Sequence, residues 1–256
     1  MNFHNRFFPF LLILHIAVFA GLVVSQEEKI DQYKICEASH EAVIPVIKTG
    51  RDWWMPRHDA ILAEISQNGD NIGMIFIGDS ITHAWETRGA AVWEKYYAKR
   101  NPMNLGFSGD RTQNVLWRLD NGEIDNINPR LAVVMIGTNN VTDDTLRNAQ
   151  IADGIIAICK LLRYKLPETK ILLLGVFPRD ATVTPIRQKV AVINKIISSV
   201  ADNQWIYYLD LKDTFVDSDG LISSEIMDDY LHPTEAGYLK WAQAMESTVD
   251  ILWNCD

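Results

Sequence analysis

Short apolar runs that alternate with longer segments of helical periodicity constrain the fold of this chain more than any other feature. Five runs of strand length lie at 74–77, 103–105, 131–136, 171–176 and 205–211. Segments of helical period lie at 53–67, 89–99, 112–119, 144–165, 185–201 and 235–250. The runs are apolar on both faces, which is typical of parallel strands covered by helices. The sequence therefore predicts an α/β fold of three layers, with a five-stranded, mainly parallel sheet and right-handed crossovers.

Nothing between residues 53 and 251 divides this pattern into separate domains. The range contains no repeat, no low-complexity tract and no linker rich in Pro, Gly or Ser. With 48% hydrophobic residues, a chain of 256 residues can bury one large core. The formal net charge is -9, which argues against nucleic acid as a partner because its binding needs a basic face.

The first 25 residues have the composition of an export signal. Residues 1–6 are short and weakly basic, and residues 7–24 are nearly all apolar. Small or modest side chains at 23–25 then precede a polar stretch, as at a cleavage site. The sequence predicts a signal peptide at 1–25 that is removed, and hence a secreted protein.

An uncleaved membrane anchor is the alternative, because residues 7–24 just reach spanning length. Pro9 and His15 interrupt the apolar run and make a poor span, so cleavage is favoured. The rest of the chain then divides into an N-terminal extension at 26–52 and a catalytic domain at 53–256.

If the chain is exported, its three cysteines can form disulfides, because the compartment outside the cytosol is oxidising. Cys36 and Cys255 lie near the two ends of the mature chain, and domain termini are often close in space. We therefore expect a disulfide between them. Cys159 lies in an apolar helical segment, where a buried free thiol is expected.

Polar residues follow three of the predicted strands and precede the last predicted helix. They occur as Gly78-Asp79-Ser80 after the first strand, Gly106-Phe107-Ser108-Gly109-Asp110 after the second, Gly137-Thr138-Asn139-Asn140 after the third, and Asp228-Asp229-Tyr230-Leu231-His232-Pro233 before the helix. Because ligands bind beyond the carboxyl ends of parallel strands, we expect these residues to share one edge of the sheet.

Ser80, His232 and Asp229 have the chemistry of a serine nucleophile with its base. A serine hydroxyl attacks only when a base takes its proton, and that base needs a partner that fixes its tautomer. The Asp-x-x-His spacing lets Asp229 reach one ring nitrogen of His232 while the other nitrogen faces Ser80. The N–H groups of Ser80 and Gly106 and the Asn139 side-chain amide would stabilise the oxyanion.

Each of these residues also has a simpler interpretation when it is taken alone. Ser80 could cap a helix, and Asn139 could serve a turn. An isolated Asp-x-x-His could be a surface turn or half of a metal site. The order of the residues and their positions at successive strand ends favour catalysis, while for Asp79 we expect a role in its own turn.

Four sequence blocks make the chain resemble the GDSL, or SGNH, hydrolase family. They are, in order, Gly78-Asp79-Ser80, Gly106 within Asn-Leu-Gly-Phe-Ser-Gly-Asp, Gly137-Thr138-Asn139 and Asp229-Tyr230-Leu231-His232. Further stretches resemble the catalytic subunits of intracellular platelet-activating-factor acetylhydrolases, namely Trp54-Met55, 115–119 with Asn121-Gly122-Glu123, and Phe215-Val216 with Ser218-Asp219-Gly220. The resemblance extends from about residue 53 to the last helix.

The resemblance implies a flavodoxin-like version of the three-layer fold, with Ser80 as nucleophile, His232 as general base and Asp229 as its orienting partner. It places the oxyanion hole at the Ser80 and Gly106 N–H groups and the Asn139 side chain. It implies no metal and no organic cofactor, and it suggests a homodimer. The chain lacks the Gly-x-Ser-x-Gly elbow, which argues against an α/β-hydrolase fold.

The expected function is that of a serine esterase that removes short acyl groups, above all acetyl, from a small ester. Ile81 follows the nucleophile and Leu231 precedes the base. If these bulky side chains close the acyl pocket, only acetyl or slightly longer groups fit; the alternative is that both only pack in the core. Arg111, near the expected mouth of the site, either holds an anionic substrate group or is a solvated surface residue.

The alcohol half of the substrate stays open at this point. The resembled acetylhydrolases work in the cytosol on a phospholipid, whereas an exported enzyme could be a carbohydrate O-acetylesterase acting on acetylated sugars. A non-catalytic binding protein on the same fold is a third alternative, although every catalytic position is filled. The sequon at Asn140 abuts Asn139, and we expect Asn140 to be unmodified because a glycan there would crowd the oxyanion hole.

Overall fold

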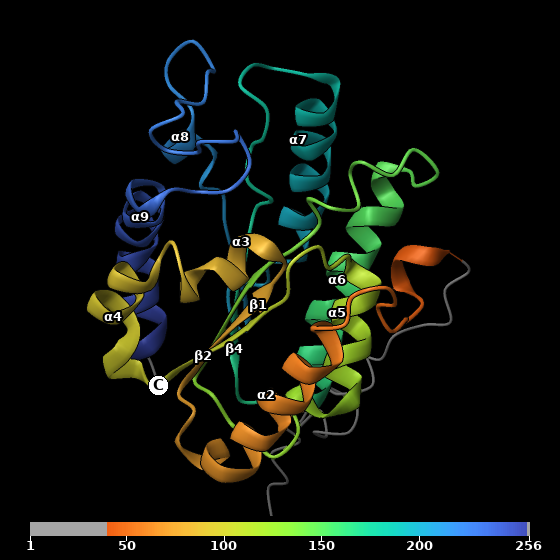
Figure 1. Ribbon diagram of the computed structural model, residues 1–256, viewed down its shortest axis with the longest axis vertical. Helices are drawn as coiled ribbons and strands as arrows, with labels where there is room; N and C mark the ends of the chain where they lie inside the picture. The colour runs from red at the N-terminus through yellow and green to blue at the C-terminus, as the bar shows by residue number, and fades with distance from the viewer. Residues whose placement is uncertain (1–39, 255–256) are drawn as a thin grey trace, which may run out of the picture.

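Five parallel strands form the centre of the computed structural model, which describes residues 40–254 (Figure 1). They are β1 (Met74–Gly78), β2 (Pro102–Gly106), β3 (Leu131–Met135), β4 (Lys170–Leu174) and β5 (Ile206–Leu209). Their order is β2-β1-β3-β4-β5, and every neighbouring pair is parallel. This is the strand order of the flavodoxin-like fold, so the predicted fold class is confirmed.

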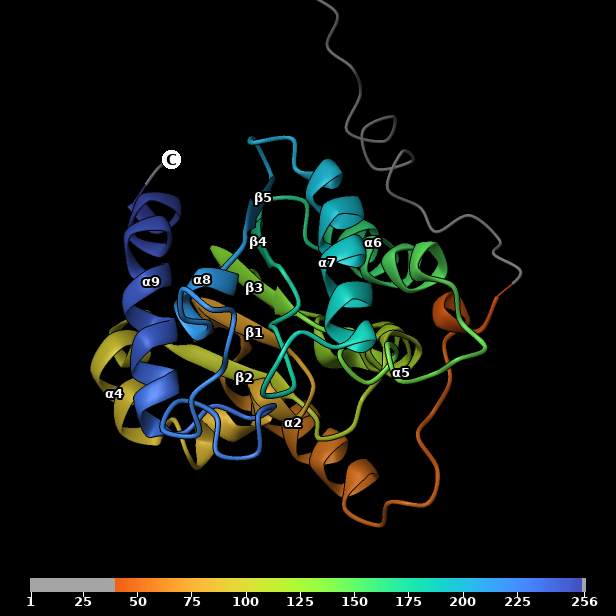
Figure 2. The same cartoon turned by 90° about the horizontal axis from the view of Figure 1, so that it is seen from above.

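Helices cover both faces of the sheet (Figure 2). One layer contains α2 (Trp54–Asn68), α5 (Thr112–Arg118), α6 (Asn148–Lys165) and α7 (Pro185–Ile197). The other contains α3 (Ser80–His83), α4 (Ala90–Tyr97), α8 (Lys212–Phe215) and α9 (Glu235–Asn254). Short helical turns complete the described chain, namely η1 (Glu41–Val43), η2 (Gly69–Asn71), η3 (Ala84–Glu86), η4 (Ala98–Arg100), η5 (Leu119–Glu123) and η6 (Ser198–Val200).

Alternate side chains of a strand pack beneath the two helix layers. In β1, Ile75 and Ile77 belong to the cluster under α5, α6 and α7, whereas Met74 and Phe76 belong to the cluster under α4 and α9. All five residues of β1 are buried. A strand covered on both faces needs apolar residues at successive positions, which explains the continuous apolar runs in the sequence.

Two of the helices were not predicted from the sequence, and a third helix begins later than predicted. α3 and α8 have four residues each, which is too short for a helical period to show in the sequence. α6 begins at Asn148 rather than at 144 because Asp143 starts a turn, in which its Oδ1 accepts from Thr145 N at 3.0 Å. The chain enters the helix only after this turn.

The described part of the predicted N-terminal extension, residues 40–52, packs on the domain. η1 contacts both α5 and α6. Ala42 O accepts from Thr112 Oγ1 at 2.7 Å, and Val46 N donates to Gln113 O at 3.1 Å. These contacts hold the segment beside the N-terminal end of α5, which directly follows the end of β2.

Some expectations concern residues that the structure does not describe. The segment 1–25 and the cysteines Cys36 and Cys255 lie outside residues 40–254, so export and the disulfide stay predictions. Cys159 is a buried free thiol, as expected. Within residues 40–254, no helix combines the length and the apolar character needed to cross a membrane.

Candidate active site

Ser80 lies at the junction of β1 and α3. Asp79 caps this helix, since its Oδ1 accepts from Ile81 N at 3.0 Å. A side chain at Gly78 would meet Met135 O at 2.4 Å, so glycine is needed where β3 lies this close. The result is a serine at the carboxyl end of β1, at the point where the strand order reverses and where ligands bind in such sheets.

Ser80, His232 and Asp229 form one continuous hydrogen-bonded chain. Ser80 Oγ lies 2.8 Å from His232 Nε2, and His232 Nδ1 lies 2.7 Å from Asp229 Oδ2. Burial alone would raise the pKa of Asp229, but hydrogen bonds from His232 and from Leu231 N outweigh it and hold the pKa below its ordinary value. A charged Asp229 carboxylate is therefore in place to stabilise His232 when the imidazole takes a proton.

The loop that carries Asp229 and His232 is fixed in an unusual conformation. Tyr230, between them, has a φ of 59°, which is costly for a bulky residue and requires support from its surroundings. Asp180 N donates to Tyr230 O at 2.8 Å, and Tyr230 N donates to Met227 O at 3.0 Å. These contacts fix the turn in the conformation that brings the Asp229 carboxylate and the His232 imidazole together.

The expected role of Gly106 in the oxyanion hole does not fit the structure. Gly106 N donates to Asn104 Oδ1 at 2.8 Å, and the residue is buried. A side chain at this position would meet His83 N at 2.2 Å, so the glycine lets β2 lie against α3. We therefore correct the prediction: Gly106 serves packing, and its N–H is already engaged.

The turn after β2 offers a different donor, Gly109 N. Asp110 N donates to Phe107 O at 3.1 Å, which makes 107–110 a β-turn. Gly109 has a φ of 77°, as the third position of a type II turn requires. It is exposed, and its N–H has no hydrogen-bond partner among residues 40–254. Asn139 Nδ2 donates to Asp110 O at 2.9 Å, so the predicted amide lies at the same turn.

A buried ionic cluster supports this turn from below. Arg118 Nε donates to Asp110 Oδ2 at 2.8 Å, and Arg118 also pairs with Glu123; all three side chains are 0% exposed. Trp54 Nε1 donates to the second oxygen of Asp110 at 2.8 Å, while His58 Nδ1 lies 2.8 Å from Glu123 Oε1. Since buried charges need such partners, this cluster fixes Asp110 and with it the end of the turn.

Comparison with known proteins identifies the family. The GDSL-like lipase/acylhydrolase family matches residues 76–240. Platelet-activating factor acetylhydrolase IB subunit alpha2 of Homo sapiens is 34% identical over 201 residues, which are 78% of this chain and 85% of that protein. Subunit alpha1 of Homo sapiens is 34% identical over 195 residues, which are 76% and 81%. The chain belongs to the GDSL-like lipase/acylhydrolase family.

Solved structures of this family share the fold. A GDSL-like lipase from Bacteroides thetaiotaomicron VPI-5482 superposes with a TM-score of 0.62 and 20% identity, covering 78% of this chain and 96% of that one. An acetylxylan esterase from Geobacillus stearothermophilus gives 0.57 and 17% identity, covering 74% and 97%. Membership of the GDSL family makes the chain an ester hydrolase, as expected from its sequence.

His83 is a feature of this GDSL site that the sequence did not reveal. It lies one turn after Ser80 on α3, and its Nδ1 accepts from Ser108 N at 3.3 Å and lies 3.0 Å from Ser108 Oγ. Burial lowers the pKa of His83, and the charge of Arg57 adds to this effect while Glu86 opposes it. A neutral His83 thus accepts from the turn 107–110, which is held at Ser108 as well as at Asp110.

The two residues that were predicted to close the acyl pocket pack in the same apolar cluster. Ile81 is 1% exposed and belongs to the core under α9, and Leu231 is partly buried against the same cluster.

Asn140 is 0% exposed, and its Oδ1 accepts from Thr112 N at 3.0 Å. The buried Asn140 side chain therefore has a structural role, which is consistent with the expectation that it carries no glycan.

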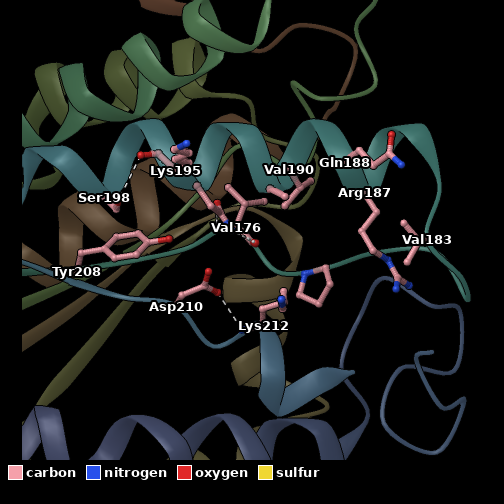
Figure 3. A pocket seen from close by; sticks show the side chains of 13 residues that line it. Val176, Val183, Arg187, Gln188, Val190, Lys195, Ser198, Tyr208, Asp210 and Lys212 are labelled. Atoms are coloured by element: carbon pink, nitrogen blue, oxygen red, sulfur yellow. Dashed lines mark hydrogen bonds between the residues drawn. The ribbon is translucent and has the colours of Figure 1, made fainter. Parts of the chain in front are cut away.

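A hollow lies beside α7, near the carboxyl ends of β4 and β5 (Figure 3). It has a volume of about 400 Å³ and lies between α7 and the strand residue Tyr208, with Val176 at its base. None of the described residues that line it belongs to the chain of Ser80, His232 and Asp229. We therefore do not place the reacting ester there.

Asp79, the acidic residue of the GDSL motif, is wholly buried and makes a pH-dependent contribution to stability. Its Oδ2 has no hydrogen-bond partner among residues 40–254, and burial raises its pKa from 3.8 to about 7, against the hydrogen bond from Ile81 N. Between pH 3.8 and about pH 7, the Asp79 carboxyl therefore keeps its proton in the folded state, whereas the same group has lost it in the unfolded chain. Stability from this group is present below pH 3.8 and is lost as the pH rises through 7.

Asp79→Asn should remove this dependence, because the amide stays neutral and its oxygen can still accept from Ile81 N. Each pKa unit corresponds to about 1.4 kcal/mol, so the stability of the variant relative to the natural chain should rise by about 3 kcal/mol between pH 5 and pH 7.5. Urea denaturation of both proteins at the two pH values measures this difference. If the free energies of unfolding of the two proteins differ by the same amount at pH 5 and at pH 7.5, Asp79 is ionised over this whole range.

Proposed function

We propose that this chain is a serine esterase that removes short acyl groups, above all acetyl, through an acyl-enzyme on Ser80. The observation that carries the proposal is the continuous hydrogen-bonded chain from Ser80 through His232 to Asp229. The names of the human relatives, which are acetylhydrolase subunits, support the choice of acetyl.

In the first step, Ser80 Oγ attacks the ester carbonyl carbon while its proton passes to His232 Nε2. The carbonyl oxygen becomes negative, and the N–H groups of Ser80 and Gly109 and the Asn139 amide are the donors that would stabilise it. The N–H of Ser80 belongs to the first turn of α3, where backbone donors have no partner within the helix.

The intermediate then collapses and the bond to the alcohol oxygen breaks. His232 returns the proton to the leaving alcohol, and the acyl group stays on Ser80. Water repeats the sequence: it gives a proton to His232, attacks the acyl carbon and releases the acid, and the proton returns to Ser80. Asp229 stays charged and orients the imidazole through both steps.

The acyl pocket is proposed to be short. Ile81 and Leu231 pack into the same apolar cluster on the α9 side of Ser80, so a long acyl chain would have to displace core side chains. Overpacking of this kind costs about 1–3 kcal/mol for extra methylenes. Acetate should therefore be preferred over longer acids.

Hydrolysis of p-nitrophenyl esters from acetate to octanoate tests this proposal. We expect kcat/KM to be highest for acetate and to fall by at least about tenfold at octanoate, since each 1.4 kcal/mol is a factor of ten. Preference for octanoate would overturn the short pocket. Activity on none of the esters would overturn the esterase function itself.

A second experiment identifies the alcohol half of the substrate. It compares the rates at which the chain hydrolyses an acetylated phospholipid and an acetylated xylooligosaccharide. Phospholipid is favoured by the names of the relatives with 34% identity, whereas the acetylxylan esterase shares the fold alone. Faster hydrolysis of the sugar ester at equal concentration would favour the carbohydrate O-acetylesterase instead.

We further propose that the chain is exported after removal of residues 1–25, that Cys36 and Cys255 form a disulfide, and that the enzyme assembles as a homodimer. The apolar composition of 7–24 supports export. N-terminal sequencing of protein from the culture medium tests it, and a start at Gln26 is expected. Detection of the chain only in membranes, with Met1 intact, would favour the anchored alternative.

A further inference from the structure

A cavity with a basic lining adjoins the proposed oxyanion donors. It has a volume of about 710 Å³ and is lined by Gly109 and Asn139 together with three cationic side chains, Lys48, Arg51 and Arg111. The chain as a whole has a net charge of -9. Positive charge gathered beside two of the proposed oxyanion donors in an acidic protein is thus a local feature that needs a reason.

The cations of this cavity are only partly neutralised by the protein. Arg111 Nη1 donates to Asp143 Oδ2 at 2.6 Å, and Glu41 is the one acidic residue in the described lining. The Arg51 side chain is exposed and makes no hydrogen bond or ion pair within residues 40–254. Among the described residues, nothing therefore competes with a ligand for the Arg51 guanidinium.

Lys48 contacts the turn that carries the proposed donor Gly109, because its Nζ donates to Gly109 O at 2.6 Å. Burial lowers the pKa of Lys48, and the charges of Arg111 and Arg51 act in the same direction, while Asp110 opposes them. Bringing like charges together in a half-buried site is unfavourable. A bound anion would remove this repulsion.

We propose that this cavity, formed by Lys48, Arg51 and Arg111, binds an anionic group, a phosphate or a carboxylate, on the alcohol half of the ester substrate. The inference rests on the proposed function: an acetyl group carries no charge, so the anion belongs to the alcohol. Guanidinium and ammonium groups form charge-assisted hydrogen bonds with both anions. Lys48 connects this subsite with the turn that carries the oxyanion donor Gly109.

The segment 40–52 supplies two of the three cations of this subsite, Lys48 and Arg51. The third, Arg111, directly precedes α5. Val46 is held on both sides, by the bond from its N to Gln113 O and by Asn114 Nδ2, which donates to Val46 O at 3.0 Å. The cations are thus carried by backbone that is tied to the domain.

Anionic and neutral acetyl esters of similar shape test the proposal. The probes are 4-acetoxybenzoate, 4-acetoxyphenyl phosphate and the neutral methyl 4-acetoxybenzoate. We expect kcat/KM for each anionic ester, divided by that for the neutral ester, to fall about tenfold in Arg51→Met and in Lys48→Met. The intrinsic reactivity of each leaving group cancels, because the ratio is compared between protein variants.

Lys99→Met is the matched control, since it removes an exposed lysine of η4, away from the cavity. Its ratio should stay within about twofold of the natural chain, because exposed charges beyond a Debye length are screened. The larger fall, for the phosphate or for the carboxylate ester, identifies the preferred anion. Unchanged ratios in Arg51→Met and Lys48→Met would overturn the subsite while neutral esters are still hydrolysed. Failure of the natural chain on the neutral ester would overturn the proposed function instead.

Discussion

Ser80→Ala should lower kcat/KM for p-nitrophenyl acetate by about 10,000-fold or more, to near the rate without enzyme. Removal of the nucleophile from a serine hydrolase leaves only the binding and oxyanion contributions. The hydrogen bond that is lost, from Ser80 Oγ to His232 Nε2, is made at a partly buried site, so the fold should be kept. Initial rates of the two purified proteins, with matching circular dichroism spectra, measure the effect.

Ser108→Ala provides a matched control, because Ser108 is also a serine beside an imidazole. Its Oγ lies 3.0 Å from His83 Nδ1, but the same nitrogen also accepts from Ser108 N. Glu86 Oε2 lies 3.8 Å from His83 Nε2, beyond hydrogen-bond distance, so no carboxylate among residues 40–254 holds this imidazole as Asp229 holds His232. Loss of activity in Ser108→Ala with activity kept in Ser80→Ala would reverse the assignment of the nucleophile.

Arg118→Met should lower the free energy of unfolding by about 3–5 kcal/mol, because it leaves buried carboxylates without their partner. Asp110 and Glu123 are both 0% exposed and both pair with Arg118. Burial already raises the pKa of Asp110, and the charge of Arg118 opposes this rise. Urea denaturation at pH 7 measures the loss.

Arg88→Met is the control for loss of an arginine ion pair at the surface. Arg88 and Asp228 are 41% and 52% exposed, and exposed pairs contribute about 0–1 kcal/mol. The two variants should therefore differ by at least about 2 kcal/mol. A loss below about 1 kcal/mol in Arg118→Met would show that the cluster does not carry the stability we assign to it.

The fold was predictable because its central strands, β1 and β3, are buried on both faces. Continuous apolar runs such as 131–136 cannot face water, and their spacing leaves room for a crossover helix. The grouping of Ser80, His232 and Asp229 was predictable for a related reason: parallel strands bring their carboxyl ends to one edge, and the Asp-x-x-His spacing is local. These features depend on short segments and on the period of the pattern.

The error over Gly106 shows what such patterns leave out. One glycine ends β2 and another lies in the turn that follows, and the sequence does not say which N–H is engaged. That depends on the Asn104 side chain and on how closely β2 approaches α3. The chemistry of the turn carried a signal for Gly109, since Ser-Gly-Asp after an apolar residue suits a type II turn.

The basic cavity could not be predicted from single motifs either. Lys48 and Arg51 lie in a segment without periodicity, and only its packing on α5 brings them to Arg111. Contacts between such distant segments are set by the tertiary fold, as is the pairing of His83 with Ser108.

Labelling with diisopropyl fluorophosphate, which phosphorylates activated serines, tests directly whether Ser80 is the nucleophile. We expect activity on p-nitrophenyl acetate to fall in proportion to the modification, and peptide mapping to find the label on Ser80. The Ser80→Ala chain should stay unlabelled. Loss of activity with the label on another residue, or full activity with Ser80 modified, would contradict the account.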